Sequence, residues 1–109
     1  MPTPIDLLHQ QIADAFEQGA NRQALSLLQS LCRQCPNDAE AHYRLGVIEE
    51  QIGSAKGARW AYLQCLALAP TNPTAYLYAG YCLQQQGLHS AALNLYSLGA
   101  DLDESILYL

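Results

Sequence analysis

A period of 34 residues runs through almost the whole of this 109-residue chain. Glycine and alanine recur at that spacing, at Gly19, Gly53 and Gly87 and at Ala24, Ala58 and Ala92. A fixed period of this length is typical of proteins in which each block is one supersecondary unit that buries its apolar face against its neighbours. We therefore expect one domain over residues 1–109, with three units at 5–38, 39–72 and 73–106.

Each block has the pattern of a helix, a glycine and a second helix. Asp38 is a plausible N-cap for the middle block, and Asn72 followed by Pro73 has the same role in the third. The periodic glycines are expected to end the first helix of each pair in a left-handed conformation, which costs glycine little because it has no Cβ. Pro36 and Pro70 end the second helices. Since the helical pattern accounts for each block, we predict an all-α fold.

The middle block, "AEAHYRLGVIEEQIGSAKGARWAYLQCLALAPTN", resembles the consensus of the tetratricopeptide repeat. The matching residues are Leu45, Gly46, Gly53, Ala58, Tyr62 and Pro70. The third block matches through Gly80, Gly87, Ala92 and Tyr96, whereas the first has Gln11 and Ile12 where Leu-Gly is usual. The resemblance implies a right-handed solenoid of three antiparallel helix-turn-helix units. The glycines at 46 and 80 would allow two helices to approach closely, while Leu28, Tyr62 and Tyr96 fill space between pairs.

In this family one face of the first helices lines a concave groove that binds extended peptides or helices. The corresponding positions follow i, i+4, i+7 spacing, so they share one helix face. They are His9, Ala13, Phe16, Tyr43, Val47, Glu50, Leu77, Tyr81 and Gln84, with Arg44 and Tyr78 at the edge. Family members that clamp a peptide carboxylate need Lys and Asn on this face, and here only Arg44 could serve an anion. The groove is therefore expected to bind an apolar protein segment, unless the chain's own tail or a second copy covers it.

Composition narrows the classes of partner. Ten acidic residues against five basic ones give a formal charge of −5, and no Lys or Arg follows Arg59. This charge would repel a phosphate backbone, so nucleic acid is a poor candidate. No apolar run is long enough for a membrane span, and the start "MPTPIDLL" does not resemble a signal peptide. We expect a soluble, cytoplasmic protein with reduced thiols.

The residues that could carry catalysis do not converge. His9, His42 and His89 fall in three different helices, and Glu49 and Glu50 point to adjacent faces of one helix. No phosphate-binding loop, nucleophile motif or metal-binding histidine spacing is present. The sequence predicts a non-enzymatic protein without a cofactor. It gives no account of Glu49, which stands where the family usually has an apolar residue.

The stretch "LCRQCPND" contains a C-x-x-C pair, Cys32 and Cys35. Such a pair can hold zinc or carry out thiol-disulfide exchange. Zinc would need two further ligands, yet Cys65 and Cys82 fall in core columns. Redox activity would favour a helix N-terminus, and this pair lies at a C-terminal end, where the helix dipole raises thiol pKa. We interpret the pair as a repeat boundary, with Cys32 as a small core residue and Cys35 half exposed, and expect no metal site.

The final residues "SILYL", after Asp101, Asp103 and Glu104, look like the cap and first turn of a further helix that is cut short. Ile106, Leu107, Tyr108 and Leu109 would then form an uncapped apolar end. Such an end favours either a fragment of a longer protein or self-association.

Three functions follow from these observations. The first is a protein-interaction module, in a narrower form a chaperone, since the chain loosely resembles small bacterial type III secretion chaperones. The second is the N-terminal repeat domain of a longer enzyme such as a transferase. The third is a homo-oligomerising scaffold.

Overall fold

The computed structural model describes the backbone of residues 1–107 and the side chains of residues 1–102. Its six helices are α1 (Pro4–Glu17), α2 (Asn21–Gln34), α3 (Ala39–Ile52), α4 (Ala55–Leu68), α5 (Pro73–Gln85) and α6 (His89–Leu107). Residues 1–107 contain no strand. The predicted all-α fold is therefore confirmed.

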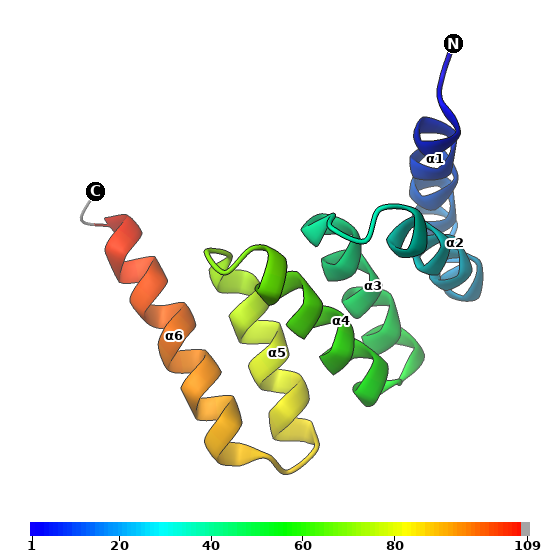
Figure 1. Cartoon of the computed structure of the whole chain (residues 1–109). Helices are drawn as coiled ribbons and strands as arrows, with labels where there is room; N and C mark the ends of the chain where they lie inside the picture. Colours follow the sequence, from blue (N-terminus) through cyan, green and yellow to red (C-terminus); the bar gives the residue numbers. More distant parts are fainter. Residues whose placement is uncertain (108–109) are drawn as a thin grey trace.

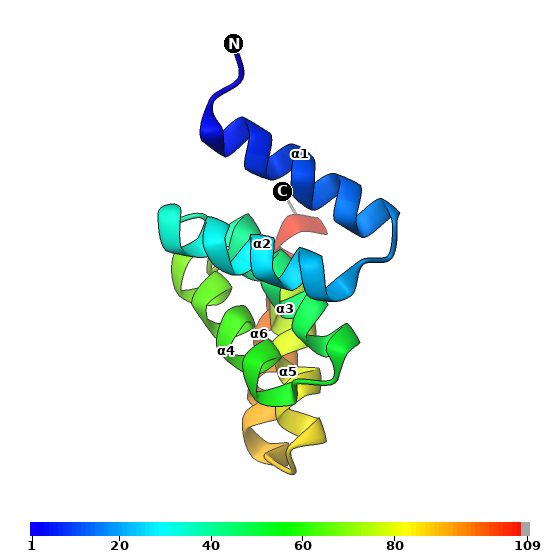
Figure 2. The same cartoon turned by 90° about the vertical axis from the view of Figure 1, so that its right-hand side faces the viewer.

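The helices form a curved row in chain order (Figure 1), and each packs mainly against the helices before and after it. Figure 2 looks along this row from the end that carries α1. The radius of gyration is 14.8 Å, larger than the value of about 13 Å expected for a compact domain of this length. The chain is thus an open array with contacts between neighbours, as a solenoid requires.

The helix ends are where the capping residues predict them. The Asp38 side chain accepts a hydrogen bond from the backbone N–H of Ala41, and Asn72 caps α5, whose first residue is Pro73. Gly19, Gly53 and Gly87 have φ angles of 67°, 96° and 79°. These left-handed values are the ones a residue with a Cβ rarely adopts.

A tyrosine ring lies across each of the two interior glycines. A Cβ on Gly46 would lie 2.5 Å from a ring carbon of Tyr62, and one on Gly80 would lie 2.7 Å from the ring of Tyr96. Tyr62 is fully buried, whereas Tyr96 is only half-buried. The close approach predicted at the glycines is therefore between helix backbone and ring, inside the pairs α3–α4 and α5–α6.

The turns before α3 and α5 are held by equivalent contacts. Nε2 of His42 lies 3.0 Å from the carbonyl oxygen of Pro36, and the Tyr76 hydroxyl donates to the carbonyl of Pro70 at 2.8 Å. Each side chain comes six residues after its proline and 34 residues from its counterpart. His42 thus has a structural role in the repeat.

Glu49, unexplained by the sequence, lies beside the first turn of α4. A Cβ on Gly57 would collide with its carboxylate, so glycine at this position leaves room for the acid. The N-terminal end of a helix carries partial positive charge, which stabilises a carboxylate placed there. Glu49 therefore has a local structural role at this helix end.

The prediction of a further helix beginning near "SILYL" is wrong, because α6 continues without a break from His89 to Leu107. Glu104 falls at the position that Pro36 and Pro70 hold in the earlier blocks, so no proline ends this helix. The expected exposure of Ile106, Leu107, Tyr108 and Leu109 lies outside the described side chains.

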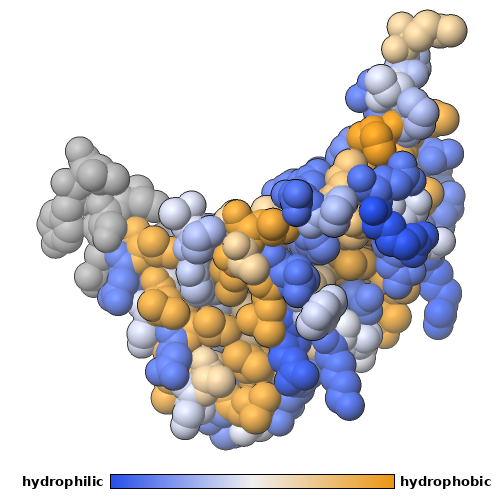
Figure 3. Space-filling model, in the orientation of Figure 1, coloured by the Kyte–Doolittle hydropathy of each residue, from blue (hydrophilic) through white to orange (hydrophobic). Residues whose placement is uncertain are grey.

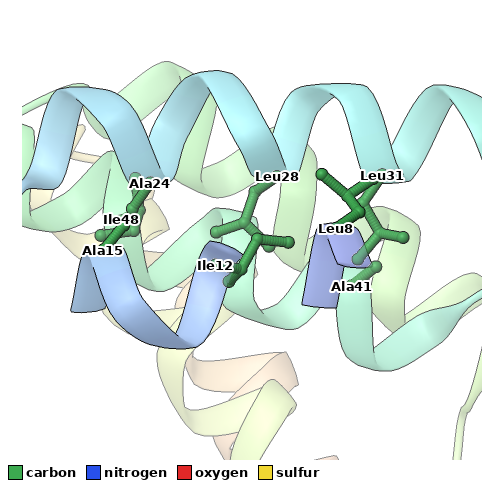
Figure 4. Close-up of a cluster of buried hydrophobic side chains, with 8 residues drawn as sticks. All are labelled: Leu8, Ile12, Ala15, Ala24, Leu28, Leu31, Ala41 and Ile48. Atoms are coloured by element: carbon green, nitrogen blue, oxygen red, sulfur yellow. The ribbon is translucent and has the colours of Figure 1, made fainter. Parts of the chain in front are cut away.

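Two hydrophobic cores hold the row together. The aliphatic core joins α1, α2 and α3 (Figure 4) and consists of Leu8, Ile12, Ala15, Ala24, Leu28, Leu31, Ala41 and Ile48. The mixed core joins α4 and α5 and consists of Ala58, Tyr62, Cys65, Leu66, Ala75, Ala79 and Cys82. Tyr43, Val47 and Tyr78 pack against the mixed core from the groove side.

Candidate protein-binding groove

The first helix of each pair, α1, α3 or α5, presents the predicted groove positions at the same three heights. The three columns are His9, Tyr43 and Leu77; Ala13, Val47 and Tyr81; and Phe16, Glu50 and Gln84. This alignment follows from the 34-residue period together with the i, i+4, i+7 spacing on one helix face. Residues of these columns line hollows between α1 and α3 and between α3 and α5.

The hollow between α1 and α3 has a volume of about 460 Å³ and is mainly apolar. Its lining residues are Ala13, Phe16, Glu40, Tyr43, Arg44 and Val47. The two charged members are paired, with Nε of Arg44 3.5 Å from Oε1 of Glu40. Four predicted site residues, Phe16, Tyr43, Arg44 and Val47, thus come together here.

Two hollows lie between α3 and α5, and Glu50 and Tyr81 line both. One, of about 320 Å³, is completed by Leu77, Tyr78 and Tyr96. The other, of about 310 Å³, is completed by Gly53, Ala55, Cys82 and Gln85. Leu77 is 56% exposed and Tyr81 is 49% exposed, so a partner can reach both side chains.

Two groove tyrosines, Tyr43 and Tyr78, form a wall over the mixed core and contact its Tyr62. The ring centroids of Tyr43 and Tyr78 lie 5.9 Å apart, and the buried Tyr62 ring stacks on Tyr78 at 5.7 Å. Such distances are within the range of favourable aromatic pairs. Burial, together with the neighbouring Tyr78, raises the pKa of Tyr43, and burial raises the pKa of Tyr62. The hydroxyls of Tyr43 and Tyr62 therefore stay protonated and uncharged at neutral pH.

The Glu50 carboxylate accepts a hydrogen bond from a buried thiol. Sγ of Cys82 donates to Oε1 of Glu50 across 3.2 Å. Burial and this carboxylate raise the pKa of Cys82 to about 12. The thiol therefore remains a neutral donor, which is the opposite of an activated nucleophile.

The remaining predicted site residues lie apart from these hollows. His9 is exposed on α1, one turn before Ala13. Gln84 accepts a hydrogen bond from the Tyr96 hydroxyl at 2.8 Å and lines a separate hollow of about 230 Å³ with His89 and Leu93. Two neighbours of the groove, Tyr96 and Cys82, were not predicted from the sequence. The signal for Tyr96 was Gly80, which leaves space for its ring. The signal for Cys82 was its place next to Tyr81, a predicted groove residue.

All four cysteines are free thiols, and Cys32 and Cys35 are both half-buried. Cys32, predicted to be a small core residue, is partly buried and packs at the edge of the aliphatic core. Within residues 1–102 no three His, Cys, Asp or Glu side chains gather as a metal ion would require. None of the helices in the described part of the chain combines the length and hydropathy needed to cross a membrane.

Comparison with known proteins identifies the family, because residues 10–73 match the tetratricopeptide repeat. The chain belongs to the tetratricopeptide repeat family. Proteins of this fold bind other proteins. The match covers most of the first predicted unit, all of the second and only the first residue of the third. The division into three repeats at 5–38, 39–72 and 73–106 therefore stays a prediction.

Among curated proteins, the chain is similar to a protein named probable biofilm formation methyltransferase WspC from Pseudomonas putida. The two are 34% identical over 76 residues, which is 70% of this chain and 18% of that protein. The chain thus corresponds to less than a fifth of its relative.

Among solved structures, MamA superposes with a TM-score of 0.89 at 20% identity, over 96% of this chain and 61% of that one. A MamA from Desulfovibrio magneticus RS-1 gives 0.85 at 18% identity, over 94% and 58%. At this identity the similarity shows the repeat fold alone.

Proposed function

We propose that this chain is a non-enzymatic interaction module that binds an apolar peptide or helix in the groove formed by α1, α3 and α5. The observation that carries the proposal is the line of accessible, mainly apolar hollows between these helices. Burying each large side chain contributes roughly 1.5–3 kcal/mol before the costs of association are subtracted. Three or four such anchors, Leu77 and Tyr81 among them, suffice for binding in the micromolar range.

The proposal also includes a chaperone role, a cytoplasmic location and self-association. A secretion chaperone that shields an apolar segment before export would use this groove in the way described. We further propose that the protein is cytoplasmic and that it self-associates through its C-terminal end. Mass measurement at micromolar concentration tests self-association, because a monomer under those conditions would contradict it.

A second candidate is a repeat domain attached to a longer enzyme, with the groove receiving a partner of that enzyme. The observation behind it is the similarity to part of a protein named a methyltransferase, 34% identical over 76 residues. Reading the gene beyond the codon for Leu109 tests this candidate. A downstream domain in frame would support an N-terminal repeat domain of an enzyme, and a stop codon at that point would exclude that arrangement.

The groove assignment is tested by affinity capture with mass spectrometry, using the wild type and the double variant Tyr43→Asp/Tyr81→Asp. Charge in the groove should abolish capture of the partner. The matched control is Trp60→Asp on α4, an aromatic side chain that is 66% exposed and lies outside the groove hollows. This variant should capture the partner as the wild type does.

Circular dichroism has to show that the variants remain folded, and Tyr81→Asp alone serves if the double variant does not, since Tyr81 is the more exposed of the two. Equal capture by the wild type and a folded groove variant would sink the assignment.

A further inference from the structure

The charge in the groove differs between its two ends. In the hollow between α1 and α3, Arg44 and Glu40 form an ion pair, so that end carries its own cation. Between α3 and α5 the lining of both hollows contains one ionisable carboxylate, Glu50, and no basic side chain. A partner that fits the whole groove therefore meets a negative charge at one defined place.

One hydrogen bond orients the Glu50 carboxylate. Its Oε1 atom accepts the hydrogen bond from the buried Cys82 thiol at 3.2 Å. A carboxylate has about four lone-pair sites, so one weak donor leaves most of its capacity unused. The carboxylate lies between two hollows that are open to a partner, so the unused capacity is within a partner's reach.

Two arginines in this part of the chain have hydrogen-bond or ion-pair partners other than Glu50. The guanidinium of Arg59 donates to the side-chain oxygen of Gln86. Arg44, which comes six residues before Glu50 on α3, forms an ion pair with Glu40. No Lys or Arg occurs in α5 or α6, and the chain has a formal charge of −5. Among the described residues Glu50 forms no ion pair, so a partner can supply the complementary positive charge.

Aromatic rings complete the surroundings of this carboxylate. Tyr81 shares both hollows with Glu50, and Tyr78 shares one of them. A Lys or Arg side chain is attracted to the face of an aromatic ring, and its aliphatic stem packs on apolar surface. We propose that the groove takes an apolar segment carrying one Lys or Arg, whose charged group lies between the Glu50 carboxylate and the Tyr81 ring.

This inference rests on the proposed groove function and adds the chemistry of the ligand. The competing explanation gives Glu50 only the task of accepting the Cys82 hydrogen bond. Glu50→Gln separates the two, because the glutamine oxygen still accepts from the thiol while the charge is lost. Glu17→Gln is the matched control, since Glu17 is an exposed acid at the end of α1.

The probe is a library of random dodecapeptides displayed on phage and selected on the immobilised wild-type protein. The selected peptides should be apolar with one Lys or Arg at a common position. A synthetic peptide from this set should bind Glu50→Gln roughly three- to tenfold more weakly than wild type in fluorescence anisotropy, as expected for one partly exposed charge contact. Glu17→Gln should bind it as the wild type does, and Tyr81→Leu should weaken it while keeping an apolar surface.

A peptide with Met in place of the selected Lys or Arg gives a double-mutant cycle. The wild type should lose affinity for this peptide, whereas Glu50→Gln should bind both peptides equally. Additive losses in the cycle, or selected peptides without a basic residue, would overturn the inference and leave the groove function intact. Equal binding of the selected peptides by folded Tyr43→Asp/Tyr81→Asp would instead refute the groove function, and the inference with it.

Discussion

The aliphatic core and the mixed core share five repeat columns but differ in chemistry. Leu31 of the first corresponds to Cys65 of the second, and Ile48 corresponds to Cys82. The fully buried side chains of the aliphatic core are all hydrocarbon, whereas the mixed core also buries thiols and a phenol. The repeat backbone thus requires apolar volume at these columns and accepts different chemistry in filling it.

One pair of columns shows how volume is exchanged between the cores. Ile12 packs with Leu28 in the first unit, and the same two positions hold Gly46 and Tyr62 in the second. The first unit fills this space with two aliphatic side chains, whereas the second fills it with the Tyr62 ring alone, because glycine has no side chain. This exchange also explains why the first block departs from the usual Leu-Gly: its second helix offers Leu28, which leaves space for Ile12.

The difference extends to the surface. In Figure 3 the hydrophobic surface gathers over the C-terminal half, while the surface near α1 and α2 is mostly hydrophilic. Among the described side chains, the two buried polar atoms without a hydrogen-bond partner, the Tyr62 hydroxyl and Nε2 of Gln86, also lie in the C-terminal half. We infer that the aliphatic core mainly supplies stability, and that the mixed core supports the groove.

The largest expected effect comes from truncating one column in each core. Leu31→Ala should cost about 2–5 kcal/mol of unfolding free energy, because Leu31 is 1% exposed and its removal leaves a cavity. Cys65→Ala in the same column removes a smaller group and should cost roughly 1 kcal/mol. Urea unfolding followed by circular dichroism measures both. Equal losses would mean that the two cores do not differ in their contribution.

The next effect tests the volume exchange. Gly46→Ile should cost about 3 kcal/mol, the upper end of the overpacking range, because its Cβ already meets the Tyr62 ring. Gly46→Ile/Tyr62→Leu copies the pair found in the first unit and should recover a large part of this loss. Thermal unfolding of wild type, the two single variants and the double variant provides the comparison. A double variant as unstable as the sum of its parts would rule out the exchange.

The free energy of unfolding should depend on alkaline pH over a wider pH range through the Cys82 thiol of the mixed core than through the Cys32 thiol at the edge of the aliphatic core. Burial and Glu50 raise the pKa of Cys82 to about 12 from its ordinary 9.0. The protonated thiol is favoured in the fold, so its contribution is complete below pH 9 and is lost as the pH rises toward 12. This group alone gives a slope of at most about 1.4 kcal/mol per pH unit.

Cys82→Ala should remove that slope across the whole range, as measured by urea unfolding at several pH values. Cys32→Ala is the matched variant of the aliphatic core, where burial raises the pKa to about 11. The contribution of Cys32 to the pH dependence of the unfolding free energy should therefore end about one pH unit below that of Cys82. Identical pH profiles for the two variants would contradict the assignment of Cys82 to the more enclosed site.

Much of the fold could be predicted because it depends on local rules. The period, the left-handed Gly53 and the caps at Asp38 and Asn72 each involve residues close in sequence. The groove columns follow from the period combined with the helical repeat. The bond from Cys82 to Glu50 could not be predicted, since it depends on how two helices pack at a distance of 32 positions along the chain.

The smallest expected effect concerns the hydroxyl of Tyr62, which is buried without a hydrogen-bond partner among the described residues. Tyr62→Phe should leave the unfolding free energy unchanged or raise it by up to about 1 kcal/mol, because an unsatisfied polar group is removed from the core. Tyr76→Phe is the matched control: its hydroxyl donates to the Pro70 carbonyl at 2.8 Å, and its loss should cost about 1 kcal/mol. If Tyr62→Phe were the more damaging of the two in urea unfolding, the hydroxyl would have a partner in solution. The mixed core would then be as fully satisfied as the aliphatic core, and its polar atoms would carry no cost in stability.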